Sequence, residues 1–157
     1  YDNDLLRDTL EVQGPNGLLT VYRARHGRQV EAVVFQVQGR GYAGPIVCMM
    51  AVDRGGHVLG VRVLKHTETP GLGDKIEPAK SGWIHAFENR FLGDPPENKW
   101  AVKKDGGAFD KFPGATITPR AVVNAVRGGL EFFEKDRAIL LDEAATPPGK
   151  TATGAAT

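Results

Sequence analysis

Four short apolar segments joined by glycine-containing turns constrain the fold of this chain more than any other feature. They span residues 21–25, 29–38, 46–53 and 57–64. The connections after the first and third segments have three residues each, too few for the crossover helix that a parallel strand needs. The sequence therefore predicts an antiparallel meander rather than a series of parallel β-α-β units.

The length and composition are those of one ordinary globular domain. The chain has 157 residues, of which 41% are hydrophobic and 25% charged. These values exclude both a disordered chain and a membrane bundle. We expect an α+β fold, with a twisted antiparallel sheet and packed helices, over residues 1–142. Residues 143–157, rich in Pro, Gly, Ala and Thr, are expected to form a flexible C-terminal tail.

The remaining elements are predicted from shorter patterns. Residues 4–12 indicate a short helix or a fraying lead-in segment, residues 81–87 a helix, and residues 100–103 a further strand. Thr118-Pro119 begins a long helix, since Thr is a good N-cap and Pro a good first helical residue. Its apolar face holds residues at helical spacing, and the small ones predict close packing on the sheet: Val122, Ala125, Val126, Gly129, Leu130 and Phe133.

Charge and cysteine content exclude several classes of protein. Twenty Lys and Arg residues face nineteen Asp and Glu, for a net charge of +1, so a strongly basic nucleic-acid binder is excluded. The single cysteine, Cys48, allows neither an intrachain disulfide nor a cysteine-based zinc site. It lies in an apolar run, which predicts a small buried core residue.

Residues 110–119 have the features of a phosphate-binding segment. Gly114 and Ala115 allow close approach to the backbone, and the hydroxyls of Thr116 and Thr118 follow at the start of a helix. A helix N-terminus offers free N–H groups and a partial positive charge, which suit a phosphate. The alternative is that Thr118 only caps the helix and that Gly114-Ala115 is only a turn.

Residues 66–73 form a second candidate segment. Pro70 stiffens the chain, while Gly71 and Gly73 allow conformations closed to other residues, so the segment can present N–H groups and Leu72 to a flat ring. His66 and Glu68 suggest a metal-binding or acid/base pair, but two ligands do not make a zinc site.

Together, residues 66–73, 100–107 and 110–126 resemble the G subunit of the Rnf (or Rsx) ion-translocating electron-transport complex. They resemble less closely the C subunit of the sodium-translocating NADH:quinone reductase. The similarity covers about residues 1–142. The family's flavin-attachment motif is Asp-x-x-(Ser/Thr)-Gly-Ala-Thr, which matches at Asp110, Gly114, Ala115 and Thr116. Pro113 stands where the motif has Ser or Thr, which removes a hydroxyl and a backbone N–H beside the attachment position but leaves the acceptor hydroxyl of Thr116 in place.

The resemblance implies a cofactor and its site. A flavin transferase would join FMN through its phosphate to the Thr116 hydroxyl, beside Gly114, Ala115 and Thr118. The flavin ring would then lie against Glu68 and the loop formed by Thr69, Gly71, Leu72 and Gly73. Lys103 or the adjacent Lys104 would supply positive charge near the phosphate or the ring, and Asp110 would serve recognition by the transferase.

The resemblance also implies a place and a role. The full-length relatives have an N-terminal membrane helix in the bacterial inner membrane, with this domain facing the periplasm. The domain would relay electrons within a complex that couples electron flow between NADH and ferredoxin to ion movement. Its partners would be the remaining proteins of the Rnf/Rsx complex, and it would turn over no substrate of its own.

Two alternatives stay open at this stage. One is a non-redox binding module that keeps the fold, with Pro113 as a sign of lost attachment. The other is a flavin reductase that binds FMN noncovalently, although the sequence shows no nicotinamide-binding fingerprint.

Overall fold

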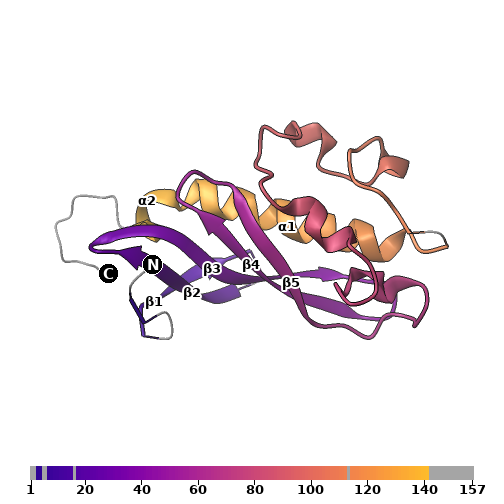
Figure 1. Ribbon diagram of the computed structural model, residues 1–157, viewed down its shortest axis with the longest axis horizontal. Helices are drawn as coiled ribbons and strands as arrows, with labels where there is room; N and C mark the ends of the chain where they lie inside the picture. The colour runs from indigo at the N-terminus through magenta and orange to yellow at the C-terminus, as the bar shows by residue number, and fades with distance from the viewer. Residues whose placement is uncertain (1–2, 5–6, 16, 113, 142–157) are drawn as a thin grey trace.

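The computed structural model describes residues 3–4, 7–15, 17–112 and 114–141. A five-stranded antiparallel sheet in the order β1-β2-β3-β4-β5 forms one layer, and helix α1 (Ile117–Lys135) packs across it (Figure 1). The predicted α+β meander is confirmed. The strands are β1 (Thr9–Gly14), β2 (Gly17–His26), β3 (Gln29–Arg40), β4 (Pro45–Asp53) and β5 (Val58–Lys65).

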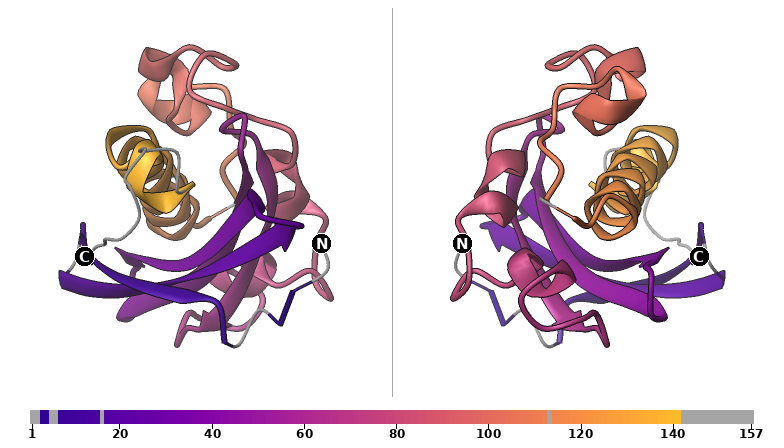
Figure 2. Two further views of the ribbon diagram at one scale, coloured as in Figure 1. Left: turned by 90° about the vertical axis from the view of Figure 1, so that its left-hand side faces the viewer. Right: turned by 90° about the vertical axis from the view of Figure 1, so that its right-hand side faces the viewer.

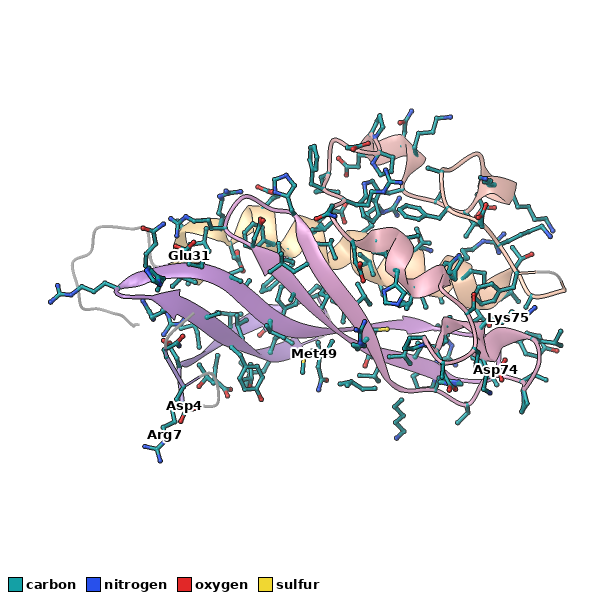
Figure 3. All side chains as sticks on the ribbon, viewed as in Figure 1. Asp4, Arg7, Glu31, Met49, Asp74 and Lys75 are labelled. Carbon is teal, nitrogen blue, oxygen red and sulfur yellow. The ribbon has the colours of Figure 1, made fainter. Side chains whose placement is uncertain are left out.

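The sheet curves around α1, as Figure 2 shows. The pairing register shifts between Ala24 and Arg25 and again between Ala51 and Val52, and such bulges increase local twist. After the second shift, Val58 and Val61 of β5 are both buried while Leu59 is half exposed, so buried and exposed residues do not alternate strictly along β5. On β4, Cys48 and Met50 are buried under α1, whereas Met49 lies on the opposite face of the sheet (Figure 3).

The face that the sequence assigns to α1 is buried, as predicted. Gly129 lies so close to the sheet that a Cβ there would stand 2.4 Å from the sulfur of Met50. The contact continues toward the start of the helix, where a Cβ on Gly39 of β3 would lie 2.5 Å from the carbonyl oxygen of Ala121. Small residues on both surfaces therefore set the distance between helix and sheet.

A loop-rich region between β5 and α1 is organised by aromatic packing. It contains four 3-10 helices: η1 (Gly73–Ile76), η2 (Trp83–Phe87), η3 (Glu97–Lys99) and η4 (Lys103–Asp105). Phe87 contacts Trp83 at 5.3 Å and Phe109 at 4.9 Å between ring centroids, and Trp83 contacts Phe112 at 5.1 Å. These contacts hold the first residues of the candidate phosphate-binding segment 110–119 in place. Trp83 Nε1–H also donates to the Asp110 carbonyl at 2.8 Å.

Three predicted elements differ in the structure. The expectation of a short helix or a fraying lead-in segment over residues 4–12 is wrong for residues 9–12, because Thr9–Gly14 forms the edge strand β1 along β2. The strand over residues 100–103 is wrong, because Trp100 is fully buried among aromatic rings and only a single bridge, Val102 to Phe109, forms. The helix over residues 81–87 is a 3-10 helix confined to Trp83–Phe87.

The C-terminal part of the described chain is short. A brief helix, α2 (Arg137–Leu140), follows α1, and the expected tail over residues 143–157 lies outside the described residues. Among the helices of the described ranges, none combines the length and apolar content needed to cross a membrane.

Cys48 should be unreactive in the native protein. It is fully buried, and burial raises the pKa of its thiol to about 12. Since the thiolate is the reactive species, a disulfide reagent at pH 8 should modify no native chains and one thiol per chain in guanidinium. Rapid modification of the native protein would contradict the buried position of β4.

Candidate functional site

A cleft of about 330 Å³ lies where the start of α1 meets two loops. Its volume falls within the range of about 300–1,000 Å³ that small-molecule sites occupy. The cleft combines the start of α1 and the segment before it with the loop after β5 and the turn between β3 and β4. It is lined by Tyr42, Glu68, Thr69, Leu72, Gly73, Gly114, Ala115, Thr116, Ile117 and Thr118.

The start of α1 differs by two residues from the prediction. Thr116 is the N-cap, and Thr118 lies inside the first turn. The Thr116 side chain makes no capping hydrogen bond and is only half-buried. Because Ile117 and Thr118 stand at the start of the helix, their N–H groups lack intrahelical partners, and the helix dipole places partial positive charge here. A half-buried hydroxyl thus stands at an anion-favouring helix end.

Glu68 is a buried carboxylate in the wall of the cleft. It accepts N–H bonds from Tyr42 and Ala43, each at 2.9 Å, and a hydroxyl bond from Thr118. Burial by itself would raise the pKa of this carboxyl, but the bonds from Thr118, Ala43 and Tyr42 outweigh it and lower the pKa. Glu68 is therefore ionised at neutral pH.

The loop after Glu68 is a tight turn. Leu72 and Gly73 both donate N–H bonds to the Thr69 carbonyl, at 3.0 and 3.1 Å. Gly71 has φ of +82°, a left-handed conformation that favours glycine. Its N–H group donates to Asp74 at 3.0 Å. Leu72 is thereby held at the cleft with 42% of its surface exposed.

Asp74 anchors this turn from its far side. Lys80 Nζ donates to its carboxylate at 2.8 Å, and this bond, followed by the one from Gly71, holds the pKa of Asp74 below its ordinary value. Asp74 and Lys75 mark this end of the molecule in Figure 3. The turn is thus tied to the 3-10 helix η1 as well as to the cleft.

Two glycines bring the loop against the start of α1. A Cβ on Gly73 would lie 2.7 Å from the Thr118 hydroxyl and 2.8 Å from Glu68 Cβ. Gly114 has φ of +75°, and a Cβ there would touch Leu72 at 3.6 Å. The two segments singled out in the sequence are therefore in contact in the fold.

Eight of the eleven predicted site residues line the cleft; Gly71, Lys103 and Asp110 are not among its lining residues. Lys103 and Asp110 form an exposed ion pair with each other at 2.7 Å. Tyr42 and Ile117 also line the cleft, and neither was predicted from the sequence. The signal for Ile117 was its place between Thr116 and Thr118, which were both predicted. Pro113 lies outside the described residues.

The sequence also suggests His66 and Glu68 as a metal-binding pair, and such a site would need at least one more ligand. Within residues 3–4, 7–15, 17–112 and 114–141, no group of three metal-ligating side chains is found. His66 Nδ1 accepts the Glu68 N–H at 3.1 Å, so its Nε2 carries the proton that lies between it and Glu77, at 2.6 Å. These bonds hold the strand end in place.

A sequence model described as "FMN-binding domain" matches residues 41–131, which include every residue lining the cleft. This chain belongs to the FMN-binding domain family. The match begins at the turn after β3 and ends within α1. The family domain thus contains both the turn that carries Tyr42 and the helix that begins after Thr116.

Curated relatives of this FMN-binding domain confirm the resemblance noted in the sequence. It is 55% identical over 133 residues to a protein of Stutzerimonas stutzeri that is named as the G subunit of an ion-translocating oxidoreductase complex. It is 50% identical over 149 residues to the protein of that name from Cereibacter sphaeroides. The alignments cover 84% and 94% of this chain, but only 58% and 67% of those relatives.

Solved structures support the fold of the FMN-binding domain. The crystal structure of Shewanella oneidensis NqrC aligns with a TM-score of 0.61 at 23% identity, covering 88% of this chain and 74% of that one. The C subunit of the Na(+)-translocating NADH-quinone reductase from Parabacteroides distasonis aligns with a TM-score of 0.54 at 24% identity, over 74% and 63% of the two chains. At these identities the likeness shows the fold alone.

Proposed function

We propose that this domain holds FMN in the cleft, joined through its phosphate to the Thr116 hydroxyl. The observation that carries the proposal is the position of Thr116. It lines the cleft, it caps α1 without using its hydroxyl for the cap, and it completes the Gly114-Ala115-Thr116 segment. The hydroxyl is thus free of a capping role at the helix end that best stabilises a phosphate.

The residues of the cleft fit a phosphate at one end and a flat ring at the other. Near Thr116, the first N–H groups of α1 and the helix dipole stabilise the charge that a phosphodiester keeps. Toward the loop, Leu72 and Tyr42 offer apolar surface, with exposed fractions of 42% and 73%. Thr69 and Gly73 bring backbone against the same space.

When bound, FMN supplies reversible electron transfer, and the protein supplies its position. A covalent bond to Thr116 would keep the cofactor from dissociating, and the packing of α1 on the sheet would hold the attachment point in a fixed place. In the product, the Thr116 oxygen would be esterified to the FMN phosphate, so the labelled chain would weigh as much as the chain plus FMN less one water. We assign this step to a flavin transferase, with the exposed Asp110 as part of what that enzyme recognises.

We further propose that the domain is the electron-relay part of the G subunit of an Rnf-type complex. The support is identity of 43–55% to relatives that carry this name. Since the first relatives are covered over about three fifths to two thirds of their length, the membrane anchor, the periplasmic orientation and assembly with the remaining proteins of the complex belong to this proposal.

The intact mass of the chain tests the proposal. Produced together with a flavin transferase, the chain should gain the mass of one FMN less one water and keep flavin fluorescence after denaturation. Release of all flavin on denaturation would favour the noncovalent reductase. A chain that stays unlabelled beside a labelled positive control would favour the non-redox binding module and contradict the proposal.

A further inference from the structure

Glu68 lies at a point of the cleft where three of its walls meet. These walls are the turn that carries Tyr42 and Ala43, the loop that begins at Glu68 itself, and the first turn of α1. We infer that Glu68 is a positioning residue, which ties the start of α1 to both loops and sets the spacing between Thr116 and residues 69–73. The role in positioning a cofactor rests on the proposed function. The set of hydrogen bonds by which Glu68 joins the three walls, called the tie below, does not.

The carboxylate has little capacity left to bind a cofactor. Oε1 accepts both the Tyr42 N–H and the Thr118 hydroxyl, and Oε2 accepts the Ala43 N–H. Only 5% of Glu68 is exposed. A carboxylate with both oxygens engaged in this way acts on the cleft through the groups it holds.

The surrounding backbone is shaped to admit this carboxylate. A Cβ on Gly41 would lie 2.8 Å from Glu68 Oε1, and one on Gly73 would lie 2.8 Å from Glu68 Cβ. Two glycines on different loops thus leave room for the same side chain. Since both loops reach the cleft, Glu68 unites segments that are 25 and 50 residues away in the sequence.

The ionised state of Glu68 suits this role, because an anion accepts stronger hydrogen bonds than a neutral acid. Burial opposes ionisation, but the bonds from Thr118, Ala43 and Tyr42 lower the pKa of Glu68. The neighbouring ring is that of His66, whose Nδ1 accepts the Glu68 N–H at 3.1 Å. Protonation would turn one acceptor oxygen into a donor and release at least one of these groups. The tie should therefore be present above the lowered pKa of Glu68 and be lost as the pH falls through it.

The first test needs no flavin. In the full 157-residue chain, the amide protons of Tyr42 and Ala43 should shift together in an NMR titration, with a midpoint below the ordinary glutamate pKa of 4.5. In Thr118→Val, which removes one donor, that midpoint should rise, and Thr118→Ser should bring it back toward the wild-type value. Amide protons that fail to titrate, or a midpoint unchanged by Thr118→Val, would overturn the inference.

The second test links the tie to the cofactor. With a flavin transferase, Thr118→Val should be labelled at least about tenfold more slowly than the wild type, and Thr118→Ser should recover most of that rate. Equal rates in wild type and Thr118→Val would overturn the positioning role. A wild type that is never labelled would instead contradict the proposed function, while the amide titration would still decide whether Glu68 ties the three walls. If Thr118→Val fails to fold, the inference is tested by the titration of the Tyr42 and Ala43 amide protons in the wild type and in Thr118→Ser, which should both titrate below 4.5.

Discussion

Replacing Thr116 with alanine should abolish covalent flavin labelling and leave the fold almost unchanged. An N-cap threonine replaced by alanine costs about 1 kcal/mol on average, because a side-chain bond to the helix is lost. Thr116 makes no such bond, so the cost in unfolding free energy should be smaller than that average. Intact mass after production with a flavin transferase, together with urea unfolding of the same samples, measures both effects.

Thr116→Ser is the matched control. It keeps a hydroxyl at the N-cap and should be labelled, whereas Thr116→Ala should not. The hydroxyl of Thr118 stands only two residues on in the same cleft, but it is committed to Glu68. Label found by peptide mapping at Thr118, or retained in Thr116→Ala, would show that the attachment site is elsewhere.

The sheet can be predicted because its signal is local. Strands β2 to β5 alternate or run apolar over five or more residues, and short glycine turns fix their antiparallel order. Strand β1 cannot be predicted in this way, because it is stabilised by pairing with β2 and not by a strand propensity of its own. In that pairing Leu10 lies opposite Val21, and Val12 lies opposite Leu19. Trp100 fits a strand pattern locally, but its burial against Phe87 and Phe109 depends on contacts that the local pattern does not contain.

The lining of the cleft can be predicted where its residues are contiguous in the sequence. Gly114, Ala115 and Thr116 stand next to one another, and so do Leu72 and Gly73, so their chemistry is visible along the chain. Tyr42 cannot be predicted, because it reaches the cleft through the turn between β3 and β4, which Glu68 holds from 26 residues away. The pairing of Lys103 with Asp110 likewise depends on the η4 turn, where the sequence pattern indicates a strand.

The two adjacent glycines of α1 should respond to alanine with opposite signs. Gly128→Ala should stabilise the protein by about 0.5–1 kcal/mol, since alanine is the better helix former and a Cβ there meets no atom within 4 Å. Gly129→Ala gains the same propensity, but its Cβ would stand 2.4 Å from Met50 Sδ and 2.8 Å from Val37 Cγ1. Both neighbours are buried, and overpacking of this kind costs about 1–3 kcal/mol.

The propensity gain is common to both variants, so their difference isolates the steric cost of moving α1 away from the sheet. Gly129→Ala should therefore unfold about 1–3 kcal/mol more easily than Gly128→Ala, a gap of at least a few degrees in the melting temperature. Because α1 begins at the cleft, a helix displaced at Gly129 should also slow labelling at Thr116, whereas Gly128→Ala should not. Equal stability of the two variants would contradict the close contact of α1 with Met50 and Val37 at position 129.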